Sequence, residues 1–225
     1  MNNEISAARY REIRDIAGQV LLERCPPRFP IPPARIISSY KKCRLVRFSV
    51  FSSKMLYFDF MSTQDFFGTR DACTLYDADE DRYLVCYNDT GMMFHQSRGH
   101  WSFAHELGHI VLGHIAETSR MVNGLTITTN ELYEKEADYF AAMLLAYPAV
   151  VRACSINEPQ ELAALARISL SAAQNRLNSM RNSAMMLSET DRLVLSKFSS
   201  FIEDWKNQQT RRPLSCVPPE PSCSH

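Results

Sequence analysis

The chain has 225 residues, 45% of them hydrophobic and 22% charged, and its 25 lysines and arginines balance 25 aspartates and glutamates. Such a chain is large enough to bury the core of one globular domain with an appendage. The balanced charge excludes a global attraction to nucleic acid or to an anionic membrane, and no apolar run approaches the roughly 20 residues of a membrane-spanning helix.

Seven cysteines are dispersed along the chain without any CxxC pair. An odd and scattered set of thiols is typical of proteins in a reducing compartment. Residues 1–4 lack the charged and then apolar character of a secretion leader. We therefore expect a cytoplasmic protein whose cysteines are free thiols rather than ligands of a second zinc site.

The N-terminal part of the chain predicts two helices. Apolar residues recur at helical spacing over residues 5–24, and a helix there would end at Cys25-Pro26-Pro27. A proline-rich connector leads to a short helix that begins near Ala34 and ends before Leu45. Proline is tolerated in the first turn of this second helix because the N–H that it lacks would have no partner there.

Four segments are expected to form strands of a small, mainly antiparallel sheet: residues 46–50, 56–60, 73–76 and 83–87. The first alternates apolar and polar residues, and the second is rich in aromatic residues. The last two flank an acidic turn over residues 77–81. This turn is similar to the start of a calcium loop but lacks its glycine and its bidentate glutamate, so we do not expect calcium there.

Two strong helical patterns follow, over residues 101–115 and 134–145. The segment between them contains a run of strand-like composition, Thr126-Ile127-Thr128-Thr129. Pro148 permits a break after the second helix. Further on, an apolar stripe predicts a last helix over residues 192–205.

Residues 159–166 and 172–181 predict two short helices separated by a turn, a spacing that resembles a helix-turn-helix. The segment carries only three arginines against two glutamates, which is a weak basic surface for a DNA-binding element. A packing role is therefore the better interpretation, and we do not expect DNA binding.

The first of the two strong helical patterns contains His105-Glu106-Leu107-Gly108-His109. Residues i and i+4 share one face of a helix, so the two imidazoles can bind one metal ion while Glu106 lies beside it. This spacing is that of zinc hydrolases. The alternative is an amphipathic helix whose histidines are only hydrogen-bonded core or surface residues.

A third ligand is available 25 residues after His109. Glu134 and Asp138 are also i and i+4, so Glu134 can bind the metal while Asp138 accepts a hydrogen bond from the free N–H of a ligand histidine. Glu136 is the alternative third ligand, although its face of the helix also carries large apolar residues. These acids would equally favour a helix N-terminus through its dipole, without binding any metal.

Residues 102–109 read Ser-Phe-Ala-His-Glu-Leu-Gly-His and are followed by Leu112-Gly113-His114, and residues 134–145 follow the pattern Glu-x-Glu-Ala-Asp-x-Phe-Ala-Ala-x-Leu-Leu. This pair of motifs resembles the ImmA/IrrE family of metallo-endopeptidases. With residues 83–88, which resemble the strand before the zinc helix in that family, the likeness covers roughly residues 30–150. The chain departs from the family at 100–102 and at 146–148, which bears on substrate fit more than on metal binding.

The resemblance implies an α+β fold. We expect a zincin-like metallopeptidase domain over residues 1–155, in which a small mainly antiparallel sheet packs on helices. A short helical extension over residues 156–206 and a disordered tail over residues 207–225 complete the division.

The motifs lead to a hypothesis for the roles of the site residues. One zinc ion per chain would be held by His105, His109 and Glu134, with Glu106 as the catalytic base and Asp138 supporting a ligand histidine. Glu136 remains the alternative third ligand. Tyr133, Tyr147, His100 and Arg98 are candidates for stabilising the oxyanion. We expect the substrate to bind extended, as an added strand beside residues 83–87.

By the same resemblance, the substrate would be a cytosolic helix-turn-helix transcriptional repressor, cut so that a mobile element, a prophage or a stress operon is released. No membrane partner is expected, and the oligomeric state stays open. One rival is a DNA-associated or partner-sensing module in which residues 159–181 act. Another is a catalytically silent regulator that binds the repressor without cutting it.

Overall fold

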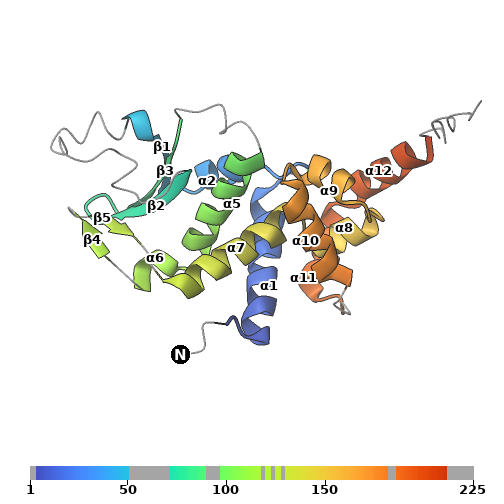
Figure 1. Cartoon of the computed structure of the whole chain (residues 1–225), viewed down its shortest axis with the longest axis horizontal. Coiled ribbons are helices and arrows are strands. Elements are labelled where there is room, and N and C mark those ends of the chain that lie inside the picture. The colour runs from blue at the N-terminus through green and yellow to red at the C-terminus, as the bar shows by residue number, and fades with distance from the viewer. Residues whose placement is uncertain are drawn as a thin grey trace, which may run out of the picture.

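The computed structural model describes residues 4–50, 71–89, 97–117, 120–122, 125–127, 130–181 and 186–211. These residues form successive layers (Figure 1). A sheet lies at one end, α5, α7 and α1 form the middle, and a group of short helices from the C-terminal part of the chain lies at the other end. The expected α+β fold, with helices packed on a small sheet and a helical C-terminal region, is confirmed.

The first two helices are α1 (Ala7–Arg24) and α2 (Pro33–Ser39). The side chain of Ser6 caps α1 by accepting a hydrogen bond from the N–H of Arg9 at 3.2 Å, and the helix ends at Cys25, before the prolines. Both helices lie where the sequence predicts them. The middle of α1 supplies Ile13 and Ala17 to the core.

Within the residues that the structure describes, the sheet has five strands in the order β1-β3-β2-β5-β4. Their bounds are Cys43–Arg47 (β1), Ala72–Asp77 (β2), Arg82–Tyr87 (β3), Arg120–Val122 (β4) and Leu125–Ile127 (β5). The β1–β3 pair is parallel, and the β2–β3, β2–β5 and β4–β5 pairs are antiparallel. The expectation of a mainly antiparallel sheet is therefore confirmed, as is the hairpin of β2 and β3 around the acidic turn.

The strand predicted over residues 46–50 is correct only for residues 46 and 47, because β1 spans Cys43–Arg47. β1 ends at Arg47, and residues 48–50 form a helical turn. Asp89 explains the change of direction, because its carboxylate accepts hydrogen bonds from both the N–H of Ser49, at 3.1 Å, and its hydroxyl, at 2.5 Å. The strand predicted over residues 56–60 lies outside the described residues.

The histidine motif lies on α5 (Ser97–Val111). The helices α6 (His114–Glu117) and α7 (Glu131–Leu145) pack beside it. The predicted helix over 101–115 begins earlier than expected and breaks at Gly113, whose φ of +76° belongs to the left-handed region. α7 is capped by Asn130, whose side chain accepts a hydrogen bond from the N–H of Leu132 at 2.9 Å.

Gly108 lets α5 and α7 approach closely. A Cβ atom at this position would lie 3.1 Å from the Cα of Ala137 and 3.1 Å from Cδ1 of Phe140. Both neighbours belong to α7 and are fully buried. The small residues at 108 and 137 thus set the spacing of the two helices that carry the predicted ligands.

The remaining helices are α8 (Pro148–Ala153), α9 (Pro159–Ala166), α10 (Leu170–Arg181), α11 (Glu189–Lys197) and α12 (Ser199–Arg211). The single helix predicted over 192–205 is in fact two helices, because a capping box of Ser188 and Asp191 starts α11 earlier and the chain breaks at Phe198. α12 continues to Arg211, past residue 207, where the tail was expected to begin. Residues 212–225 lie outside the described residues.

The C-terminal helices share their core with the rest of the molecule. One cluster of buried apolar side chains includes Ile13 of α1 and Ile202 of α12. Lys197 of α11 also donates hydrogen bonds to the carbonyl groups of Leu21 and Leu22 at 2.9 and 2.6 Å. The core is therefore continuous across residue 155, and the predicted boundary there stays a prediction. In the described part of the chain, no helix combines the length and the apolar character required to cross a bilayer.

Candidate metal centre

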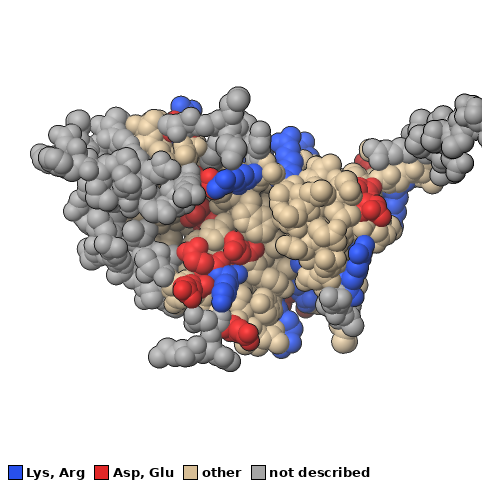
Figure 2. Space-filling view, in the orientation of Figure 1, with Lys and Arg blue, Asp and Glu red and all other residues tan. Residues whose placement is uncertain are grey.

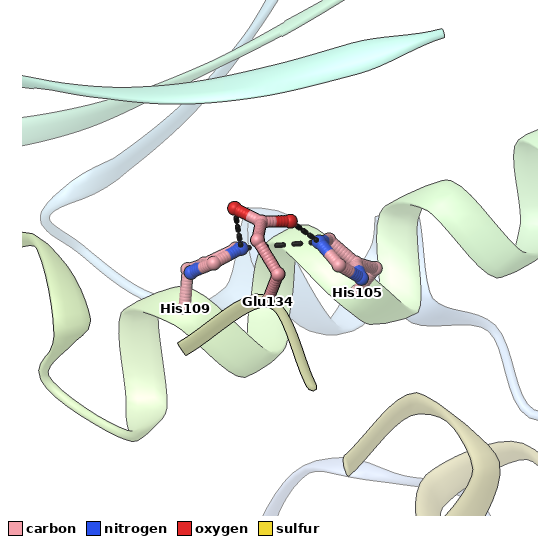
Figure 3. Close-up of side chains that lie close together, drawn as sticks. All are labelled: His105, His109 and Glu134. Carbon is pink, nitrogen blue, oxygen red and sulfur yellow. Dashed lines mark hydrogen bonds and ion pairs between the residues drawn. The ribbon is translucent and has the colours of Figure 1, made fainter. Parts of the chain in front are cut away.

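Three side chains from α5 and α7 converge on one point. The Nε2 atoms of His105 and His109 lie 3.0 Å apart, and the Oε2 atom of Glu134 lies 3.1 Å from Nε2 of His105. The other carboxylate oxygen of Glu134 lies 3.5 Å from Nε2 of His109. Figure 3 shows the carboxylate of Glu134 between the two rings. The structure thus brings together the three residues that were predicted to hold a metal.

The spacing of these donor atoms fits a zinc ion. Donors about 2.0–2.2 Å from a tetrahedral zinc lie roughly 3.3–3.5 Å from one another. The two imidazole nitrogens lie 3.0 Å apart, slightly closer than that, and the two oxygens of Glu134 lie 3.1 Å from Nε2 of His105 and 3.5 Å from Nε2 of His109. Two imidazoles and a carboxylate are also a donor set that zinc accepts. The side chain of Glu134 is 49% exposed, so the cluster is open to solvent, as a catalytic site with one free coordination position needs to be.

The electrostatics of the cluster favour a cation. Burial lowers the pKa of His105, but hydrogen bonds with Asp138 and Glu134 outweigh it and raise the pKa to about 10. Burial raises the pKa of Glu134, whereas its hydrogen bonds with His105 and His109 hold it well below the ordinary value. Acidic side chains gather in the region of α5 and α7 on the face shown in Figure 2. A metal ion would occupy the place where these carboxylates already stabilise a positive charge.

Asp138 lies beside His105, for which the sequence predicted it as a supporting carboxylate. Its Oδ1 atom lies 2.9 Å from Nδ1 of His105. A carboxylate at this nitrogen accepts a hydrogen bond from Nδ1–H and favours the tautomer whose Nε2 can bind a metal.

His109 has a different partner, His114, whose role the sequence reasoning missed. The Nδ1 atoms of the two rings lie 3.1 Å apart, and Nε2 of His114 lies 3.0 Å from Oε2 of Glu136. The left-handed turn at Gly113 starts a new helix at His114, and this places its ring against α5. The sequence held one signal for this contact, since His114 belongs to the family motif.

Glu136 therefore lies outside the donor cluster. Its carboxylate accepts hydrogen bonds from Nη2 of Arg9 at 2.6 Å and from Nε of Arg9 at 3.0 Å, in addition to its contact with His114. Burial raises the pKa of Glu136, but Arg9 and then His114 lower it by more. The structure places Glu134, rather than this alternative ligand, beside His105 and His109.

The carboxylate of Glu106 faces the sheet. Thr74 of β2 donates a hydrogen bond from its hydroxyl to Oε2 of Glu106 at 2.6 Å, and both residues are buried. Glu106 directly follows His105 on α5, and its charge contributes to the raised pKa of His105. Thr74 is a second residue that the sequence reasoning missed, because nothing in its surroundings along the chain marks it.

The structure separates the four candidates for oxyanion stabilisation. The ring of Tyr133 stacks on His114 with centroids 4.4 Å apart, next to the donor cluster. Tyr147 is fully buried beside Gly18 of α1, so its proposed role is wrong. Arg98 is paired with Asp71 at 2.7 Å, and His100 lines a different cavity.

The expected place of the substrate strand also needs correction. β3 (residues 82–87) lies inside the sheet and pairs with β1 on one side and β2 on the other. A strand with both neighbours present cannot accept an added one. The strand composition of residues 83–87 was read correctly, but the position of a strand within a sheet is not encoded in its own sequence pattern.

Comparison with known protein families decides the identity of the fold. The model of the IrrE N-terminal-like domain (Peptidase_M78) matches residues 67–178, which include both motifs. The chain belongs to the ImmA/IrrE family. No curated protein matches it significantly. The family is one of metallopeptidases, which agrees with the cluster of His105, His109 and Glu134.

Proposed function

We propose that the chain is a zinc-dependent endopeptidase that hydrolyses a peptide bond in a protein substrate. The observation that carries this proposal is the convergence of His105, His109 and Glu134, with Glu106 directly after His105 on the same helix. Zinc bound there would polarise the peptide carbonyl and lower the pKa of a water molecule toward neutrality.

Glu106 is the residue placed to move protons. As a carboxylate it accepts the proton of the attacking water and then delivers it to the departing amine. The hydroxyl of Thr74 donates to one carboxylate oxygen at 2.6 Å, which fixes the orientation of the group and leaves the other oxygen for the water. Tyr133, next to His114, is the candidate that supports the developing oxyanion.

The remaining residues hold the two imidazoles in place. Asp138 fixes the ring of His105 through Nδ1. His114 does the same for His109 and is held in turn by Glu136 and Arg9. With both Nδ1 atoms engaged, both Nε2 atoms keep their lone pairs for the metal.

We infer that the substrate binds in an extended form beside β2 rather than β3. Within the described residues, β5 pairs with β2 only at Tyr76 and Asp77, so the 72–75 part of β2 has β3 as its one strand neighbour. This part contains Thr74, which contacts Glu106. A peptide paired with it would run past the catalytic carboxylate.

The substrate we propose is a helix-turn-helix transcriptional repressor in the cytoplasm, cut so that a mobile element, a prophage or a stress operon is released. Family membership supports this substrate class. The arginines of α10 argue against the alternative that the chain binds DNA. Arg176 is buried and donates to the carbonyl of Ala146, and Arg181 donates to the carbonyl of Asn157.

The test is to mix the zinc-loaded chain with purified candidate repressors and follow cleavage by mass spectrometry. Wild type should cut one repressor at one bond. Glu106→Gln should lose at least 100-fold in rate, the order of effect that general acid–base catalysis supplies. Glu203→Gln, on the exposed face of α12, should retain full activity.

Two outcomes of this experiment contradict the proposal. Full activity of Glu106→Gln with zinc bound would show that another group is the base. A stable complex with a repressor that wild type never cuts would identify a catalytically silent regulator instead.

A further inference from the structure

A cavity lies at the N-terminal end of α5, away from the metal centre. Its volume is about 670 Å³, within the range that accommodates small organic ligands. The proline-rich connector before α2, the ends of β1 and β3, the first turns of α5 and the turn between α9 and α10 line it. The metal centre faces β2, where Thr74 contacts Glu106, whereas this cavity lies at the β1 side of the sheet.

The charged lining of this cavity is strongly basic. Arg35, Arg47 and Arg167 line it together with a single acid, Asp89. These four side chains carry a net charge of +2, although the whole chain has none. Among the described residues, neither Arg35 nor Arg167 has a carboxylate within ion-pair distance, so two guanidinium groups are available to an incoming anion.

A neutral polar group completes the basic side of the cavity. The Nε2 atom of His100 is buried and has no hydrogen-bond partner among the described residues. His100 and Gly99 lie in the first turn of α5, where backbone N–H groups have no partner within the helix and the helix dipole favours a negative charge. The backbone N–H groups add hydrogen-bond donors to the positive charge of the arginines, and Nε2 of His100 donates as well in the tautomer that carries the ring proton there.

The rest of the cavity lining is apolar. The rings of Phe103 and Tyr87 meet edge to face with centroids 5.4 Å apart, and both line the cavity with Leu45 and three prolines. An apolar wall of this kind binds the body of a ligand, while a few polar groups fix its head.

We propose that this cavity is a binding site for a small phosphate monoester with an apolar or aromatic body. A phosphate monoester carries about −1.5 to −2 charges at neutral pH, which matches the net charge of the lining. Guanidinium groups bind phosphate oxygens in a bidentate fashion. A monocarboxylate would neutralise only half of the charge. Phe103 and His100 belong to the same helix as His105. A small molecule bound in this cavity would therefore contact the helix that carries the predicted metal ligands.

Binding can be measured by isothermal titration calorimetry on the full zinc-loaded chain at low salt, with phenyl phosphate, inorganic phosphate and benzoate as probes. We expect phenyl phosphate to bind at least tenfold more tightly than either of the others. Arg35→Ala and Arg167→Ala should each weaken its binding tenfold or more, since each removes a charge-assisted hydrogen bond. Arg44→Ala, an exposed arginine of β1 that does not line the cavity, should bind like wild type.

One variant separates this site from the metal centre, which could itself attract phosphate. His105→Ala should keep the affinity for phenyl phosphate, because it removes a ligand of the proposed zinc and no group of the cavity. The unfolding temperature of each variant without ligand checks its folding. If Arg35→Ala were poorly folded, Arg167→Ala, on an exposed turn, would still carry the test.

Three results would overturn the proposal. The first is that phenyl phosphate does not bind at millimolar concentration. The second is that its binding persists in Arg35→Ala and Arg167→Ala, and the third is that its binding disappears in His105→Ala. Equal affinity for inorganic phosphate and phenyl phosphate would refute the apolar part of the site. Binding of a glutamate-rich peptide in place of phenyl phosphate would show that the basic lining serves a polypeptide.

Discussion

The Nδ1 atoms of His109 and His114 lie 3.1 Å apart. Nε2 of His109 belongs to the donor cluster, so His114 contacts the other ring nitrogen of His109. If His109 binds metal through Nε2, its Nδ1 carries the proton and donates it to Nδ1 of His114. Nε2 of His114 then carries a proton for Glu136, at 3.0 Å. Burial lowers the pKa of His114 to about 4, so the ring is neutral, as this arrangement requires.

Replacing His114 should weaken metal binding without abolishing it. We expect His114→Ala to lower zinc affinity about 10–100-fold, the usual effect of removing a group that orients a ligand histidine. Competition with a chromogenic chelator measures this affinity. His100→Ala, outside the donor cluster, is the control. Unchanged zinc affinity in well-folded His114→Ala would show that the contact does not position His109.

A substitution of Thr74 should lower the rate of hydrolysis and leave the zinc content unchanged. Thr74→Val keeps the shape of the side chain but removes the hydroxyl that donates to Glu106. Hydrogen bonds to charged groups contribute about 1.5–3 kcal/mol, so kcat should fall about 10–100-fold at unchanged zinc content. Thr74→Ser should recover most of the rate. A Thr74→Val variant with the kcat of wild type would remove Thr74 from the catalytic arrangement.

Gly108 should be sensitive to added side-chain volume. A Cβ atom there already meets Ala137 and Phe140 at 3.1 Å, so Gly108→Val must push α5 and α7 apart. We expect the free energy of unfolding to fall by about 1–3 kcal/mol, as for other overpacked cores, and the zinc affinity to fall with it. Urea denaturation measures the first quantity. Ser102→Val, on the same helix, should have a much smaller effect than Gly108→Val, and equal effects would argue against the close approach.

His100 should make the protein less stable in acid. Burial, with a smaller effect of Arg167, lowers its pKa from 6.5 to about 4. Between these two values the unfolded chain binds more protons at this residue than the folded one, so stability is full above pH 6.5 and falls as the pH is lowered toward 4. From pH 7 to pH 5 the loss should be on the order of 1–2 kcal/mol.

The comparison of wild type with His100→Asn isolates this contribution. Urea midpoints at pH 7 and pH 5 should differ less in the variant, because asparagine does not titrate. The same difference in both proteins would mean that the loss in acid comes from other groups.

The sequence predicts those parts of the site that are local. His105 and His109 share a helix face, as do Glu134 and Asp138, and a spacing of four residues is sufficient to place each pair. The contacts that hold these residues could not be predicted, because they join distant parts of the chain. Arg9 and Glu136 are 127 residues apart in sequence, and Thr74 and Glu106 are 32 apart.

The same limit explains the errors in the fold. Alternation over Val46, Phe48 and Val50 predicts a strand, but the hydrogen bonds of Ser49 with Asp89, 40 residues away, end it at Arg47. β3 was identified as a strand from its composition. Its place between β1 and β2 depends on pairing partners that its own residues do not specify.

Metal content tests the central claim most directly. Purified chain equilibrated with excess zinc and then desalted should contain one zinc ion per molecule by mass spectrometry. His105→Ala and Glu134→Ala should lose it. Glu131→Gln and Glu136→Gln, whose carboxylates lie outside the cluster, should retain it. Wild type without zinc would contradict the account, and zinc retained by Glu134→Ala but lost by Glu136→Gln would contradict the ligand set derived from the structure.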